Sequence, residues 1–259
     1  MNGSDLNKVK EIAIDKFKES LEDNLFAIIL SGSVPQNTFK NGWSDLDLLL
    51  IVKILNFDVK RSISETVSHL EGDSDVHHGV NTITMEEFLN PLAPEILLDG
   101  KTLQAFIDIK KYPDRIVYAK EPINIEDVYF PNPKVMRGYS ISNIGMFLRR
   151  NRSTLTRATE DSIEGLKELL KKEIRATFII TKLAVQYFTG IPQYDNKEIL
   201  EQSKLIFPDF DFDVLEENNN IIKKWEQLQD RAMLSEFFHK NDNYIEQFSH
   251  YVFKKLGNE

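Results

Sequence analysis

The stretch LSGSVPQNTFKNGWSDLDLLLIV, residues 30–52, joins a turn of small residues to an apolar run that begins with two aspartates. Side chains two positions apart on a strand project to the same face, so we predict that Asp45 and Asp47 lie side by side. Two carboxylates that close raise each other's pKa and destabilise the fold unless a cation compensates them. The stretch therefore predicts a cation site at the start of a buried strand.

The turn before the aspartates suggests what accompanies the cation. Mg²⁺ is typically bound by one or two carboxylates together with the phosphates of a substrate. Gly32 lets the backbone approach a phosphate closely, and Ser33 can donate both its N–H and its hydroxyl. We interpret the stretch as a site for a metal-bound nucleoside triphosphate.

Composition limits the other classes of function. The chain has 259 residues, 41% of them hydrophobic, and no cysteine, which excludes disulfides, thiolate catalysis and sulfur-ligated zinc and fits a cytoplasmic setting. A formal net charge of −9 argues against general nucleic-acid binding, which depends on Lys and Arg. No apolar segment approaches the roughly 20 residues that cross a bilayer, so we expect no membrane partner. The sequence leaves open whether the chain forms a homodimer.

The flanking residues predict alternating helices and strands followed by helices alone. Helical spacing over 5–21 and 59–72 and apolar or alternating runs over 24–33, 44–52 and 75–84 indicate two helices and three strands. We therefore expect an α+β fold. Its predicted parts are a small mixed sheet with flanking helices over 1–122, a proline-containing linker over 123–135 and an all-α helical bundle over 136–259.

Three features of the second half define its expected helices. Residues 162–190 predict a long central helix, because its second half is apolar nearly all round and Gly190 precedes Pro192. We expect a last helix over 221–256, with a break near His239 to Asp242. The asparagines at 218–220 are interpreted as a loop or a helix cap.

Gly32 and Ser33, followed by SDLD at 44–47, resemble the signature of the nucleotidyltransferase superfamily of DNA polymerase β type. The order of the predicted domains is similar to that of the bacterial aminoglycoside and lincosamide nucleotidyltransferases and of the minimal nucleotidyltransferases. The resemblance implies that Asp45 and Asp47 hold one or two Mg²⁺ ions and that Gly32 and Ser33 contact the β- and γ-phosphates of ATP or another triphosphate. Ser44 and Thr38 are further candidates for the nucleotide site.

The implied reaction moves a nucleoside monophosphate, AMP from ATP, to a hydroxyl of a small molecule such as an antibiotic. The superfamily usually places a third carboxylate on the neighbouring strand, and the stretch most similar to that motif, NTITME at 81–86, has Asn81 at the position of the carboxylate. Asp75 shares the strand face in a regular strand, and His77 or His78 could act as a base because imidazole titrates near neutrality. An alternative for the histidines is one buried ring and one solvated ring.

Two functional hypotheses follow from the asparagine at position 81, where the superfamily usually has a carboxylate. The first is an active nucleotidyltransferase whose third catalytic group is unusual. The second is a catalytically impaired protein with the same fold that binds a nucleotide or a protein partner, as an antitoxin does. A purely structural interpretation also stands, in which Ser44 is a turn residue and Asp47 pairs with a nearby Lys or Arg.

Overall fold

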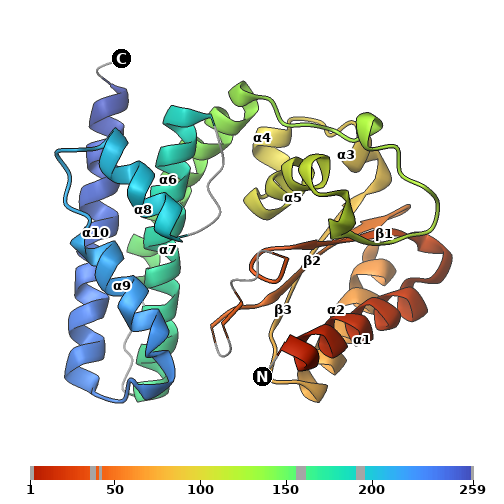
Figure 1. Cartoon of the computed structure of the whole chain (residues 1–259), viewed down its shortest axis with the longest axis horizontal. Helices are drawn as coiled ribbons and strands as arrows, with labels where there is room; N and C mark the ends of the chain where they lie inside the picture. Colours follow the sequence, from red (N-terminus) through yellow and green to blue (C-terminus); the bar gives the residue numbers. More distant parts are fainter. Residues whose placement is uncertain (1–2, 36–38, 41–42, 156–161, 191–195, 258–259) are drawn as a thin grey trace. The chain divides into compact units, whose positions relative to one another are not determined.

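The chain forms two compact units in the computed structural model, Met1–Pro131 and Asn132–Glu259 (Figure 1). The structure describes residues 3–35, 39–40, 43–155, 162–190 and 196–257. The predicted α+β class is confirmed, since strands occur in the first unit and the described part of the second unit is helical. The change from one unit to the other falls after Pro131, inside the segment 123–135.

The first unit is built on a four-stranded sheet with the order β3-β2-β1-β4. Strand β1 (Leu25–Ser31) runs antiparallel to β2 (Leu46–Val52) and to β4 (Ile116–Ala119). Strand β3 (His78–Thr84) runs parallel to β2, so the connection needs a crossover, which helix α2 (Phe57–Asp73) provides. The sheet is therefore mixed, as predicted. The short edge strand β4 was not predicted from the residue pattern.

Every residue of β1 and β2 is buried, because helices cover both faces of the sheet (Figure 1). Helices α1 (Gly3–Leu21) and α2 lie on one side. Helices α3 (Met85–Leu89), α4 (Pro94–Leu97) and α5 (Gly100–Lys111) lie on the other. Strands covered on both faces read as continuous apolar runs rather than alternating ones. Asp47 is a charged residue inside such an apolar run, so its surroundings must compensate a buried carboxylate.

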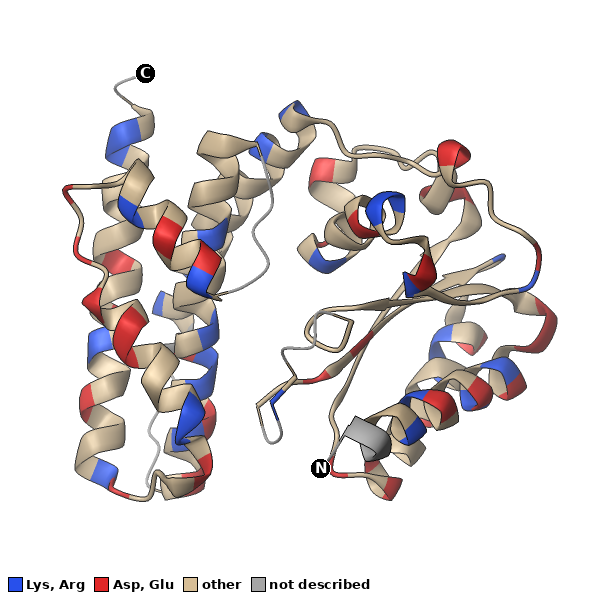
Figure 2. Cartoon of the chain, in the orientation of Figure 1, with Lys and Arg blue, Asp and Glu red and all other residues tan. Residues whose placement is uncertain are grey.

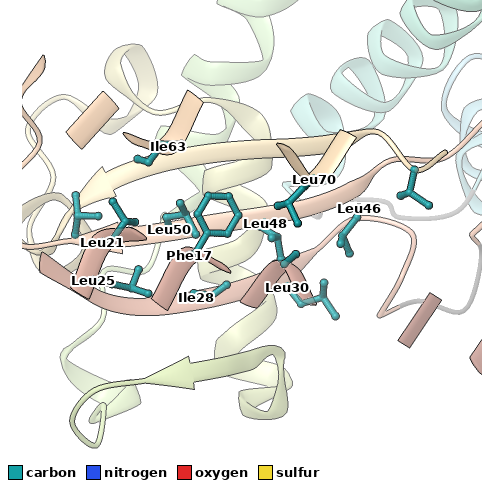
Figure 3. Packing of buried hydrophobic residues seen from close by; sticks show 13 residues of the cluster. Phe17, Leu21, Leu25, Ile28, Leu30, Leu46, Leu48, Leu50, Ile63 and Leu70 are labelled. Atoms are coloured by element: carbon teal, nitrogen blue, oxygen red, sulfur yellow. The ribbon is translucent and has the colours of Figure 1, made fainter. Parts of the chain in front are cut away.

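The side of the sheet that faces α1 and α2 forms a continuous apolar core (Figure 3). Phe17 of α1 and Leu70 of α2 pack there against Leu48 and Leu50, alternate residues of β2. Because side chains alternate along a strand, Asp47 and Leu49 project to the opposite face, toward α3 and α5. Lys, Arg, Asp and Glu are interspersed over α1 and α2 (Figure 2). The polar site and this core thus occupy different faces of one sheet.

The second unit contains the helices α6 (Pro133–Leu155), α7 (Ile163–Thr189), α8 (Asn196–Ile206), α9 (Asp213–Lys223) and α10 (Arg231–Leu256). The central helix α7 packs against α6, α8 and α10. It begins after Ser162, whose side chain caps it, and ends at Gly190 in the left-handed conformation, as the sequence predicts. No helix in the described ranges is long and apolar enough to cross a membrane.

Two expectations for this unit were wrong. Helix α10 runs through His239 to Asp242 without a break, and the interruption falls earlier, between Lys223 and Arg231. Asn218 lies inside α9 rather than in a loop or cap, and its buried amide donates to Asn241 Oδ1 (2.7 Å). A buried polar side chain is tolerated in a helix when a partner satisfies it, so asparagines here signal an interhelical contact.

Candidate functional site

Asp47 lies in the middle of the sheet, near the end at which β1 stops and β2 starts. It pairs with Ser31, the last residue of β1, and with Gly79 of β3. Only 12% of its side chain is exposed. A carboxylate this buried needs compensation from cations or hydrogen-bond donors. The strand pairing therefore places one buried acidic group between the turn after β1 and the backbone of β3.

Two glycines enclose the Asp47 carboxylate. Gly32, at the start of the turn after β1, has φ +72°, and a Cβ on it would overlap Oδ2 of Asp47. A Cβ on Gly79 would overlap the other oxygen, Oδ1. Residues with a Cβ rarely adopt a φ near +70°, so the turn and the close approach both favour glycine at position 32. Each carboxylate oxygen thus abuts backbone that leaves no room for a side chain.

Lys101 supplies a positive charge to this carboxylate. Its Nζ contacts Oδ1 of Asp47, although the two residues are 54 positions apart in the chain. Lys101 stands in the first turn of α5, after the N-cap Asp99, and 54% of its side chain is exposed. A pairing of Asp47 with a lysine, one component of the purely structural interpretation, is thus observed. The sequence prediction named no partner, and nothing local to Lys101 distinguishes it from a solvated lysine.

Asp45 and the two serines lie in the loops around Asp47. Asp45 precedes β2, which begins at Leu46, so the expectation that both aspartates belong to the strand is wrong for Asp45; its side chain is half-buried. Ser33 belongs to the turn after β1. Ser44 closes a turn, because its N–H donates to the Lys40 carbonyl (2.8 Å) and its Oγ accepts from the Lys40 N–H (3.0 Å). Thr38 lies outside the described residues.

The sequence candidates for a third group lie in β3 or just before it, and the structure separates them. Asp75 is exposed in a bend before β3, which begins only at His78, so the expectation of a regular strand from 75 was wrong. His77 is exposed and its Nδ1 contacts Glu71 of α2. Asn81 shares the sheet face of Asp47 but pairs with Leu49, two residues further along. The residue of β3 directly opposite Asp47 is Gly79.

His78 is buried on the other face of the sheet, with the apolar core of α1 and α2. It pairs with Leu46, and neither ring nitrogen has a partner within the described part of the chain. Burial lowers the pKa of His78, because desolvation penalises the charged imidazolium. The alternative of one buried and one exposed ring in this histidine pair is therefore confirmed.

Two carboxylates, those of Asp45 and Asp47, stand at or beside the start of β2. Among the described residues, no three His, Asp or Glu side chains gather in a way that could hold a metal. Asp45 and Asp47 would offer carboxylate oxygens to one Mg²⁺ ion, which takes its remaining ligands from water and substrate phosphates. A second ion would lack a carboxylate on β3, where Gly79 stands.

Comparisons with known proteins bear on the fold. No protein-family model and no curated protein sequence matches the chain. Its structure is similar to that of the spectinomycin adenyltransferase AAD(9) from Enterococcus faecialis, solved with ATP and spectinomycin. The TM-score is 0.57 and the identity 10%, over 93% of this chain and 99% of that one. The likeness thus extends over both units, and the chain shares the fold of this adenyltransferase.

Proposed function

We propose that this protein is a nucleotidyltransferase that moves AMP from ATP to a hydroxyl of a small molecule. The observation that carries the proposal is the enclosure of the Asp47 carboxylate by the Gly32 turn at the end of β1, in a chain with an adenyltransferase fold. Backbone N–H groups in a glycine turn can approach phosphates more closely than a turn with side chains allows.

Each residue of the site would have a separate role in the transfer reaction. Asp45 and Asp47 would hold a Mg²⁺ ion, which supplies charge stabilisation to the phosphates when bound. Gly32 and Ser33 would position the far phosphates. The acceptor oxygen forms its bond to the α-phosphorus while the bond from that phosphorus to the bridging oxygen breaks. Pyrophosphate leaves, and the proton of the hydroxyl passes to solvent.

A second candidate function is nucleotide binding without transfer, with or without a protein partner. Gly79 favours it, because the strand position opposite Asp47 carries no carboxylate that could accept a proton or bind a second ion. The contact between Lys101 and Asp47 favours it too, since the ammonium already compensates the carboxylate. Both candidate functions use the same nucleotide site. Only the first converts ATP and releases pyrophosphate.

The first experiment therefore separates binding from turnover. Calorimetry with Mg²⁺ and α,β-methylene-ATP measures binding, and pyrophosphate release from ATP in a panel of aminoglycosides and other antibiotics bearing hydroxyls measures transfer. We expect both signals in the wild type, and Asp47→Asn should reduce pyrophosphate release by at least a hundredfold, since transition-state charge stabilisation of this kind is worth roughly 10²–10³ in rate. Binding without release would support the second candidate, and full release by Asp47→Asn would overturn the mechanism.

A further inference from the structure

The ammonium of Lys101 contacts Asp47, the more buried of the two aspartates of the site. It contacts Oδ1 of Asp47, the oxygen that faces β3, while Oδ2 faces the Gly32 turn. A Cβ on Gly79 would lie 3.3 Å from Lys101 Nζ, tighter than most contacts of a side-chain carbon. The ammonium therefore rests over the bare backbone of β3, beside the residue that pairs with Asp47.

The glycine at position 79 and the place of the Lys101 ammonium depend on each other. Any side chain at position 79 would press on both the Asp47 oxygen and the lysine nitrogen. An aspartate or glutamate there could hold a second metal ion against Asp47, but its side chain would need the space that Lys101 uses. Gly79 therefore supplies no metal ligand, and the space that a side chain would fill is left to the Lys101 ammonium.

We propose that Lys101 is a built-in cation of the nucleotide site, whose ammonium takes the place of one of two metal ions beside Asp47. This inference rests on the proposed nucleotide site and adds to it that a triphosphate binds with a single divalent ion. An ammonium carries one positive charge and donates hydrogen bonds, so it can stabilise phosphate oxygens. An ammonium is a hydrogen-bond donor without an acceptor site, so it does not act as a base toward the acceptor hydroxyl.

The inference predicts two opposite effects of removing the charge. Lys101→Met keeps much of the length of the side chain but leaves Asp47 without this cation. Mn²⁺ in the absence of nucleotide should then bind more tightly, on the order of tenfold, because a positive charge beside its ligand has been removed. The Mn²⁺ complex of α,β-methylene-ATP should bind more weakly, on the order of tenfold, because the phosphates lose a cationic donor.

The measurement is metal counting by electron paramagnetic resonance on the full chain, with Mn²⁺ alone and with Mn²⁺ plus α,β-methylene-ATP. We expect one bound Mn²⁺ per wild-type chain with the analogue present. Lys101→Arg, which retains the charge, should behave as wild type. Lys111→Met makes the same change at the other end of α5, where the ammonium lies 5.0 Å from the Tyr112 ring, and should leave both affinities unchanged.

Three outcomes would contradict the inference about Lys101. Two Mn²⁺ ions per wild-type chain with the analogue would overturn the inference while the nucleotide site survives. Lys101→Met could instead bind Mn²⁺ as tightly as wild type does, and bind the analogue as tightly as wild type does, with a matching circular dichroism spectrum. The contact between Lys101 and Asp47 would then be a structural ion pair only. Failure of the analogue to bind wild type at all would overturn the proposed function and this inference with it.

Discussion

At the scale of single residues, the candidate site depends on the absence of two side chains as much as on the presence of two carboxylates. Gly32 and Gly79 bring backbone against the two oxygens of Asp47. The ammonium of Lys101 contacts one of these two oxygens. The residues that matter come from the turn after β1, from β2, from β3 and from the start of α5.

Gly32→Ala tests the turn. Alanine at φ +72° costs about 1–2 kcal/mol of folding free energy, and its Cβ would displace the Asp47 carboxylate. We expect a loss of that size in urea unfolding and at least a tenfold weaker binding of Mg²⁺ and α,β-methylene-ATP in calorimetry.

Gly72→Ala is the matched control for this change. Gly72 lies in α2, and a Cβ there meets nothing within 4 Å. Alanine in a helix is more favourable than glycine by about 0.5–1 kcal/mol, so the control should be at least as stable as wild type with unchanged nucleotide binding. Equal behaviour of the two variants would show that the turn at Gly32 has no special role.

At the scale of elements, helix α7 is defined by signals at its own ends. The Ser162 Oγ accepts from the Gly165 N–H (3.0 Å), and Gly190 ends the helix at φ 70°. Between them lies an apolar second half that packs against α6 and α10. Caps act over a few residues, which is why both ends of this helix could be predicted from sequence.

Ser162→Ala should destabilise α7 and the unit built around it by about 1 kcal/mol, the usual cost of removing an N-cap side chain. Urea unfolding of the full chain, followed by circular dichroism, measures this loss. Ser162→Asp keeps an acceptor at the cap and should stay within a few tenths of a kcal/mol of wild type. If both variants were equally destabilised, the hydrogen bond to Gly165 would not be the cause.

At the scale of the whole molecule, the second unit carries a buried acidic group that links stability to pH. Glu173 of α7 is 5% exposed, and within the described residues its Oε2 has no hydrogen-bond partner. Desolvation, and to a lesser extent the negative charge of Asp242 on α10, raise the pKa of Glu173 to about 7. Asp242 in turn accepts from Asn151 of α6 (2.8 Å). These three residues come from three helices, α7, α10 and α6.

The sign of the pH dependence follows from proton binding. Between the ordinary pKa of 4.5 and about 7, the folded state holds a proton on Glu173 that the unfolded state has released. Stability should therefore fall as pH rises through this window, by about 3 kcal/mol in total. Urea unfolding at pH 5 and pH 8 measures most of this difference.

Glu173→Gln removes the titrating group and should flatten this profile, with higher stability than wild type at pH 8. Glu168→Gln changes an exposed carboxylate on the same helix and should leave the profile as it is in wild type. A wild-type profile that persists in Glu173→Gln would assign the pH dependence to other groups.

The sequence alone determined the α+β class, strands β1 and β2, helices α1, α2 and α7, and the pairing of a glycine turn with an aspartate strand, because periodicity, caps and apolar runs act over neighbouring residues. It did not determine which residue of β3 faces Asp47. The resemblance placed Asn81 at the position of the third carboxylate, and in the structure Asn81 pairs with Leu49 while Gly79 pairs with Asp47. Nor could it pair Asp47 with Lys101, 54 positions away. Register and long-range pairing are set by how whole faces pack together, and only the tertiary structure holds that information.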